Sequence, residues 1–367
     1  MKLRKSQVHT NVQSIPELRF EDQRLSSFSG CVLLQRLFQN LSLRDRLRRC
    51  FEHRPERLVV GFPTIVFIMI VHLMLGFRRL RDIERYREDP VVLRALGLRR
   101  MPNVSTVCRS LARTDRPSVE NVRLLSREYV VSRLEAEKFS RVTLDFDGSV
   151  ISTGKFAEGT AVGYNNKRKG ERSYYPLLCT VAQTAQVLDV FHRSGNVHDS
   201  HKAIEFMKGC IEAVRARLPG VILESRKDAA FFSEKMVDFL DSQGVQFSIA
   251  VPFECFAELK LLTESRRGWK RLDSLWDSFE SDWAPKCWHR RYRFLFLRYR
   301  VKKQSKQPVQ LELFAPHEQG YEFKVIVTNK RGKAKSILLF HNGRASQATN
   351  CTSCRRCLLT TCIANFR

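Results

Sequence analysis

The hydrophobic periodicity of the chain changes abruptly at Arg141. Before it, apolar residues recur every three or four positions, as in GCVLLQRLFQNLSLRDRLRRCF and RPSVENVRLLSREYVVSRLEAEKF. This is the spacing of amphipathic helices. After it, apolar and polar residues alternate in RVTLDFDGSVIST, as in a half-buried strand. The sequence therefore predicts an all-helical domain over residues 1–138, followed by a domain that contains a sheet.

Helices and strands alternate in the second part. Three predicted strands lead into the amphipathic segments SHKAIEFMKGCIEAVRARLPG and FSEKMVDFLDSQG, each followed by an apolar strand. Strand patterns return in RRYRFLFLRYRVKK, QLELF and YEFKVIVTNK. We predict an α/β fold in which a mixed sheet with flanking helices over residues 139–258 is interrupted by a β-rich insertion over 259–335. A final helix is expected to begin at 336–347, before a tail over 348–367. The four tryptophans of the insertion are expected in its core rather than on a base-stacking surface.

The charge of the chain points to a polyanionic partner. The 367 residues include 64 Lys and Arg against 38 Asp and Glu, a net charge of +26. Such an excess favours nucleic acid, because neutralised phosphates release counterions. An anionic membrane is the alternative. The uncharged run Leu58 to Phe77 is long enough to span one, but it contains Pro63 and His72, so we expect a buried helix and no membrane contact. The amino terminus lacks the apolar core of a signal peptide, which predicts a cytoplasmic location.

A short basic helix is predicted after Pro102 and Asn103 in LGLRRMPNVSTVCRSLARTDRPS. Arg109 and Arg113 would share one face of it, four residues apart. This arrangement suits a recognition helix in a DNA groove. It is equally typical of a surface helix with solvated arginines, and the sequence leaves both open.

Carboxylates lie at the ends of two predicted strands. Asp145 and Asp147 in LDFDGS fall on the same face of a strand, and Asp228 closes the apolar strand of ILESRKD. Open α/β sheets gather their sites at such strand ends. In so basic a chain, the pair Asp147 and Asp228 suggests a divalent-metal site, since Mg²⁺ commonly takes one or two carboxylates together with substrate phosphates. The alternative is that Asp147 is a turn residue and Asp228 a helix cap.

An ordered set of motifs resembles the DDE transposases of bacterial insertion sequences. It consists of LDFDGSV, GTAVGYNNKRKGERSYYPLL, SGNVHDS and ESRKDAAFFSEKMVDFLDSQGVQFSIAV, within a match from about residue 20 to Gln347. The resemblance implies a ribonuclease-H-like core and metal-dependent DNA cleavage and strand transfer. It implies Asp147 and Asp228 as catalytic and metal-binding residues for Mg²⁺ or Mn²⁺, with Asp145 a neighbour and not a ligand. It also implies double-stranded terminal inverted repeats as substrate, a homodimer in a synaptic complex, and a place near the bacterial nucleoid.

A basic and aromatic loop follows the first aspartate. GYNNKRKGERSYY supplies the cations and the ring that could grip a backbone phosphate and stack on an unpaired base. The expected DNA-binding residues are Tyr164, Lys167, Arg168, Lys169 and Arg172. A solvated hairpin tip is the alternative.

The ending departs from the family pattern. The motif Y-x2-R-x3-E-x6-K places His341 at the Tyr position and Arg344 at the Arg position, both implied to hold DNA, but Ala348 stands where Glu is expected. Four cysteines follow in CTSCRRCLLTTC. A zinc tail is conceivable, but a shifted reading frame near position 348 explains the loss of pattern better. We therefore expect a catalytically defective transposase. The alternative is a DNA-binding protein without catalysis.

Overall fold

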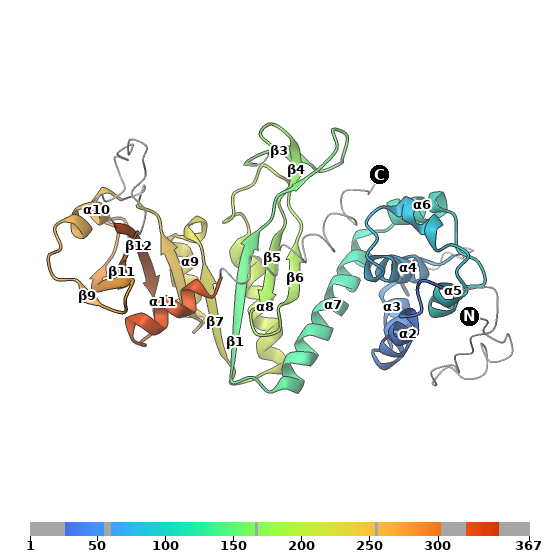
Figure 1. Cartoon of the computed structure of the whole chain (residues 1–367), viewed down its shortest axis with the longest axis horizontal. Helices are drawn as coiled ribbons and strands as arrows, with labels where there is room; N and C mark the ends of the chain where they lie inside the picture. Colours follow the sequence, from blue (N-terminus) through green and yellow to red (C-terminus); the bar gives the residue numbers. More distant parts are fainter. Residues whose placement is uncertain (1–25, 55–59, 166–167, 254–255, 302–320, 345–367) are drawn as a thin grey trace. The chain divides into compact units, whose positions relative to one another are not determined.

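The computed structural model describes residues 26–54, 60–165, 168–253, 256–301 and 321–344, and the structural statements below concern these (Figure 1). The chain divides into two compact units. Within the described residues, one unit lies within 26–129 and 151–174 and is called the helical unit here. The other lies within 130–150 and 175–344 and is called the sheet unit. The predicted strand QLELF and the cysteine-rich tail lie outside the described residues.

Helices build most of the helical unit, as the periodicity predicts. They are α2 (Cys31–Asn40), α3 (Leu43–Cys50), α4 (Phe62–Met74), the 3-10 helix η1 (Leu80–Arg85), α5 (Pro90–Leu96), α6 (Val104–Ala112) and the first part of α7 (Arg116–Glu137). Asp89 caps α5 by accepting from the backbone N–H groups of Val91 and Val92, and Gly97 ends it in the left-handed conformation. Helix α6 begins after Asn103, and Arg109 is exposed on it.

The uncharged run from Leu58 to Phe77 forms a core helix. Helix α4 starts after Gly61 with Pro63 in its first turn, where a missing N–H costs nothing, and it spans 13 residues. Its Ile68 and Val71 are fully buried, and a 2.7 Å hydrogen bond joins Nδ1 of the buried His72 and the Tyr86 hydroxyl. In the described part of the chain, no helix combines the length and apolar character needed to cross a bilayer.

A small sheet completes the helical unit. Its strands β2 (Ile151–Ser152), β4 (Arg172–Tyr174) and β3 (Ala161–Val162) lie in the order β2-β4-β3, with antiparallel pairing. The buried Ser173 pairs with Ser152 on one side and Ala161 on the other. The exposed residues between these strands include Phe156 and Tyr164.

A nine-stranded mixed sheet forms the sheet unit and confirms the α/β fold class. Its order is β6-β5-β1-β7-β8-β12-β11-β10-β9, and β1, β7 and β8 run parallel. The strands are β1 (Arg141–Gly148), β5 (Leu177–Val181), β6 (Gln186–Phe191), β7 (Ile222–Lys227), β8 (Gln246–Val251), β9 (Lys270–Arg271), β10 (Trp276–Trp283), β11 (Tyr292–Arg300) and β12 (Tyr321–Thr328). Because β12 pairs with β8, the predicted insertion extends the core sheet instead of forming a sheet of its own.

Two helices cover opposite faces of this sheet. Consecutive residues of a strand point to opposite faces. On β7, Arg226 reaches the Phe340 carbonyl of α11 (Ala334–Asn342), and Lys227 lies 3.1 Å from the Met207 sulfur of α8 (Ala203–Arg217). Figure 1 shows α8 beside β5 and β6, which it contacts. The remaining helical segments are η2 (Ala229–Phe231), α9 (Glu234–Ser242) and α10 (Ala257–Glu264).

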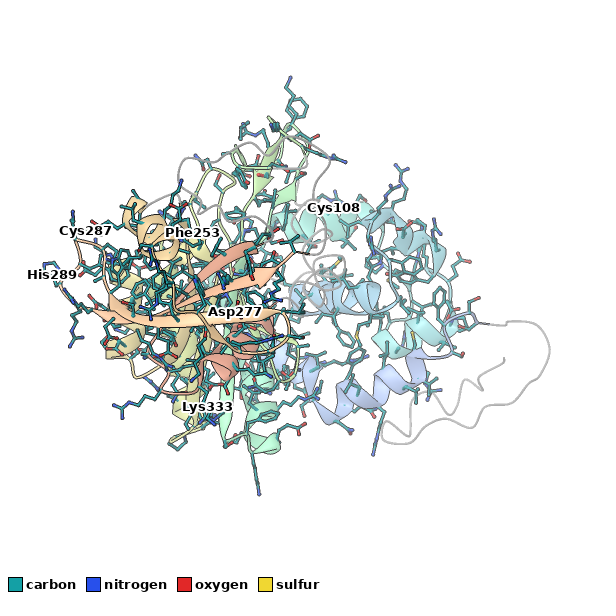
Figure 2. All side chains as sticks on the ribbon, turned by 60° about the vertical axis from the view of Figure 1, so that its left-hand side comes forward. Cys108, Phe253, Asp277, Cys287, His289 and Lys333 are labelled. Atoms are coloured by element: carbon teal, nitrogen blue, oxygen red, sulfur yellow. The ribbon has the colours of Figure 1, made fainter. Side chains whose placement is uncertain are left out.

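The tryptophans of the insertion pack against other aromatic rings. Ring centroids lie 4.8–4.9 Å apart in the pairs Trp269–Phe279, Trp276–Tyr299, Trp283–Phe294 and Trp288–Phe232. Asp277, labelled in Figure 2, lies on β10 and accepts a 3.0 Å hydrogen bond from Arg298 of β11. The ring contacts of the four tryptophans agree with the expectation that these residues pack in a core.

Candidate active site

The sheet brings Asp147 and Asp228 to the same edge. Strands β1 and β7 are parallel neighbours, and Asp145 pairs in register with Arg226. Continued by two residues, this register brings Asp147 opposite Asp228, which directly follows Lys227, the last residue of β7. Neighbouring strands lie about 4.8 Å apart, so both carboxylates share one short stretch of the sheet edge. Each side chain is partly exposed there.

Asp228 does not serve as a helix cap. It precedes the 3-10 turn η2, but its side chain accepts no capping hydrogen bond. Its Oδ2 lies 3.4 Å from Nη1 of Arg344. Its Oδ1 is buried and has no hydrogen-bond partner among the described residues. A buried carboxylate oxygen without a donor is costly, and a bound cation would compensate it.

Asp145 belongs to a buried ion pair with Arg226. It is 0% exposed, and the Arg226 guanidinium grips it with Nε 2.9 Å from Oδ1 and Nη2 2.7 Å from Oδ2. Burial raises the pKa of Asp145, and the Arg226 charge opposes that rise. This two-pronged geometry is the strong form of a carboxylate–guanidinium contact.

The same guanidinium fastens helix α11 to the sheet. Nη1 of Arg226 donates a 3.0 Å hydrogen bond to the Phe340 carbonyl in the last turn of the helix. Gly343 permits this approach, because a Cβ at that position would collide with Nη1. Since carbonyls at a helix C-terminus lack intrahelical partners, a cation there is favourable. Arg226 thereby joins β1, β7 and the helix that leads to Arg344.

His341 is buried on α11. Its residue is 4% exposed, and Nδ1 lies 3.1 Å from the Ser248 hydroxyl on β8. Burial lowers the pKa of His341 to about 3, with the charges of Lys324, Arg344 and Arg226 adding to the effect. The ring is therefore neutral and packed inside the unit. Of the two α11-end residues expected to hold DNA, Arg344 has the accessible position, with its side chain 31% exposed beside Asp228.

Acid should weaken the sheet unit through His341. The folded pKa of about 3 lies below the ordinary histidine pKa of 6.5, so the unfolded chain binds the extra proton between these values. The contribution of the neutral His341 ring to the free energy of unfolding is complete above pH 6.5 and is lost as the pH falls towards 3. The free energy of unfolding of the wild type should therefore fall relative to His341→Gln by up to about 1.4 kcal/mol per pH unit in this window. Urea unfolding at several pH values measures this, and parallel pH profiles would contradict it.

Three residues that the sequence analysis did not single out surround the Asp147 turn. Arg193, whose side chain is 2% exposed, donates through Nε to the Tyr175 carbonyl at 3.0 Å. Its Nη1 donates at 3.1–3.2 Å to the carbonyls of His198, Asp199 and His201. The Tyr175 hydroxyl donates a 2.9 Å hydrogen bond to Oδ2 of Asp199. The loop that carries Asp199 is thus wound around one buried guanidinium.

Tyr175 and Asp199 press directly on the turn. A Cβ on Gly148 would collide with the ring and hydroxyl of Tyr175 and with Oδ1 of Asp199. Burial and the charges of Asp199, Asp147 and Asp228 all raise the pKa of Tyr175. Burial and the Asp228 charge raise the pKa of Asp199. The motif SGNVHDS was used in the sequence only as part of the resemblance to a family. Its hydrophobic pattern does not predict that Asp199 lies beside the turn at Gly148.

The described residues offer a partial metal site. No group of three or more His, Cys, Asp or Glu side chains within them is arranged to hold a metal ion. Two carboxylates at a sheet edge, one with a buried oxygen that lacks a donor, nevertheless fit a hard cation. Mg²⁺ keeps several waters and needs only one or two carboxylates from the protein.

The basic loop expected to bind DNA belongs to the helical unit. Tyr164 is 77% exposed, and Arg168 and Lys169 are exposed as well. Arg172 donates from Nε to the Thr160 hydroxyl at 2.9 Å and from Nη2 to the Thr160 carbonyl, so its guanidinium supports the small sheet. Lys167 lies outside the described residues. Tyr164, Arg168, Lys169 and Arg172 are all exposed, and their contact with DNA stays a prediction.

The chain was compared with protein-family models and with solved structures. The family model described as "Transposase DDE domain group 1" matches residues 9–353. A structure of the piggyBac transposase synaptic complex with hairpin DNA aligns with 87% of this chain and 66% of its own, at 11% identity and TM-score 0.46. The Drosophila P element transposase strand transfer complex aligns with 65% and 51%, at 11% identity and TM-score 0.27. The Mos1 mariner paired end complex with Mn aligns with 61% and 78%, at 10% identity and TM-score 0.22. The chain thus spans about two thirds of the piggyBac chain and half of the P element chain. No curated protein matches it.

Proposed function

This chain belongs to the DDE transposase family, and from that premise we propose that its sheet unit is built for metal-dependent cleavage and transfer of DNA strands. The observation that supports the proposal is the register of β1 and β7, because continuing it by two residues brings Asp147 opposite Asp228 at the carboxyl ends of these strands. The expected partner is double-stranded DNA carrying the terminal inverted repeats of an insertion sequence, bound by a homodimer in the bacterial cytoplasm, near the nucleoid.

Asp147 and Asp228 would hold the divalent cation, Mg²⁺ or Mn²⁺. When bound, such a cation supplies activation of a water or 3′-hydroxyl and stabilises the leaving oxygen. Arg344 now neutralises part of the Asp228 charge at 3.4 Å. A guanidinium beside the cleft is suited to a DNA phosphate, because it can bind two phosphate oxygens at once. Asp145 and Arg226 hold the strands and α11 in register around this cleft.

Catalysis by this chain is expected to be weak. The family motif places Glu at the position that Ala348 occupies. Loss of an oriented charge in an active site commonly costs about 10²–10³-fold in rate. The alanine at position 348 supports a second candidate function, in which the chain binds the ends of the element without catalysis, as an inhibitor or remnant. Both functions require DNA binding, and they differ in strand cleavage.

One experiment separates the two candidates. The full chain is mixed with a labelled duplex that carries the terminal repeats flanking its gene, with Mn²⁺ present. Both functions predict a retarded complex that survives Asp147→Asn and Asp228→Asn. Nicking above the level of these two variants supports the transposase, whereas equal nicking supports the binding protein. Absence of a complex at low salt would reject both.

The loop of the helical unit should supply part of the affinity for DNA. In Arg168→Gln/Lys169→Gln, two exposed cations are lost while Arg172 still supports the small sheet. If each cation neutralises one phosphate, the slope of log K against log salt becomes shallower by about 1.8. The control Lys208→Gln/Arg267→Gln removes two exposed charges elsewhere. Identical salt slopes in the two double variants and the wild type would show that this loop does not contact DNA.

A further inference from the structure

We propose that Asp199 is an additional acidic residue of this site, acting on the cation held by Asp147 and Asp228 through a water molecule bound to that cation. The inference rests on the proposed function, because it presupposes that the two aspartates bind a divalent cation. It assigns a role to a residue that lies outside both strand motifs and outside the family's closing motif.

The fold places Asp199 beside the cleft with little freedom. The Arg193 guanidinium donates hydrogen bonds to four backbone carbonyls, three of them in the loop between β6 and α8. These hydrogen bonds fix the loop. The loop then rests on Gly148, the residue directly after Asp147, so closely that Gly148 has no room for a side chain. A surface carboxylate with no role would not need a buried arginine and a glycine to hold it in place.

The two oxygens of Asp199 have different surroundings. Oδ2 accepts from the Tyr175 hydroxyl at 2.9 Å. Oδ1 is buried and accepts no hydrogen bond from the described residues, and it forms an ion pair with the buried Arg193, whose Nη2 lies 3.8 Å away. Oδ1 of Asp228 is likewise buried without a donor. Two such acceptors near one sheet edge are what a hydrated cation would satisfy.

A water-mediated role fits these positions better than direct coordination. The three aspartates are not arranged as a closed metal cage, and Tyr175 already occupies one oxygen of Asp199. Mg²⁺ dehydrates reluctantly and keeps several of its waters in protein sites. A carboxylate that accepts from a metal-bound water orients that water and adds negative charge near the cation.

The competing explanation is that Asp199 only anchors the turn, through Tyr175 and through its ion pair with Arg193. Two variants distinguish these roles. Asp199→Asn removes the charge but keeps an oxygen that can accept from Tyr175, whereas Tyr175→Phe removes that hydrogen bond and keeps the charge. Asp199→Ser is a second charge-removing variant in case the first does not fold. Thermal unfolding without metal checks that each variant is folded.

The test is titration of the full-length chain with Mn²⁺, followed by electron paramagnetic resonance of the free ion. We expect the wild type to bind one or two ions, and Asp147→Asn and Asp228→Asn to lose this binding. Asp199→Asn and Asp199→Ser should bind about 10-fold more weakly, since loss of an outer partner costs about 10–100-fold in affinity. Tyr175→Phe should stay within about twofold of the wild type, because the charge that acts on the cation remains.

The outcomes separate this inference from the proposed function. If Asp147→Asn and Asp228→Asn lose binding but the Asp199 variants match the wild type, the role of Asp199 is rejected and the metal site stands. Equal weakening by Asp199→Asn and Tyr175→Phe would show a purely structural role and also reject it. If the wild type binds no Mn²⁺, or both strand-end variants bind as well as it does, the proposed function fails as well.

Discussion

Asp145→Asn should be the most destabilising conservative substitution at the sheet edge, lowering the free energy of unfolding of the sheet unit by about 3–5 kcal/mol. The wild-type carboxylate is fully buried and receives both prongs of the Arg226 guanidinium. In the variant, Arg226 keeps its charge but loses its counter-ion in a site where its side chain is only 9% exposed. Urea unfolding at neutral pH, monitored by tryptophan fluorescence, measures the loss.

A matched control shows whether burial causes the effect. Glu212→Gln removes one partner of an exposed pair on α8, in which Lys208 and Glu212 lie 3.9 Å apart and both side chains are about 60% exposed. Such pairs contribute about 0–1 kcal/mol, so this variant should unfold nearly like the wild type. A loss below about 1 kcal/mol in Asp145→Asn would contradict the view that this ion pair holds β1, β7 and α11 together.

The second large effect concerns divalent cations. Asp147→Asn and Asp228→Asn should each lower the affinity for Mn²⁺ on the order of 100-fold or more, because loss of a direct ligand costs more than loss of an outer partner. Their stability should change little in comparison with Asp145→Asn, since both side chains are partly exposed. Isothermal titration calorimetry of the folded variants gives the affinities.

Another surface acid provides the control for this effect. Asp282→Asn changes an exposed residue on β10, outside the edge formed by β1 and β7, and should bind Mn²⁺ like the wild type. If all three variants lose affinity to the same extent, the cation binds diffusely to surface charge. In that case Asp147 and Asp228 would not form a site.

The sequence was sufficient for features that depend on period and order. Alternation around Asp147 and the apolar strand before Asp228 predict two strands, and the carboxyl ends of parallel strands share an edge. The sequence also predicts that Asp145 is not a ligand, but it does not reveal the reason. The partner of Asp145 is 81 positions away, and only the register of β1 against β7 identifies it as Arg226.

Other features depend on tertiary contacts that leave no local pattern. His341 aligns with a family position that holds DNA, yet its place on the buried face of α11 directs it to Ser248. Asp199 lies in a loop without periodicity, and its position follows from the carbonyls that Arg193 gathers. The sequence predicts that Arg172 is a cation in a DNA-binding loop, but its guanidinium donates a hydrogen bond to the Thr160 hydroxyl.

The central claim is that Asp147 and Asp228 share one divalent cation, and iron-directed cleavage of the backbone tests it most directly. Fe²⁺ replaces the cation in the full-length chain, and ascorbate with peroxide then generates radicals at the bound ion. We expect cuts close to both residues 147 and 228 in the wild type, suppressed by excess Mg²⁺ and absent from Asp147→Asn. Cuts near only one of these residues, or cuts that Asp147→Asn does not remove, would contradict the claim.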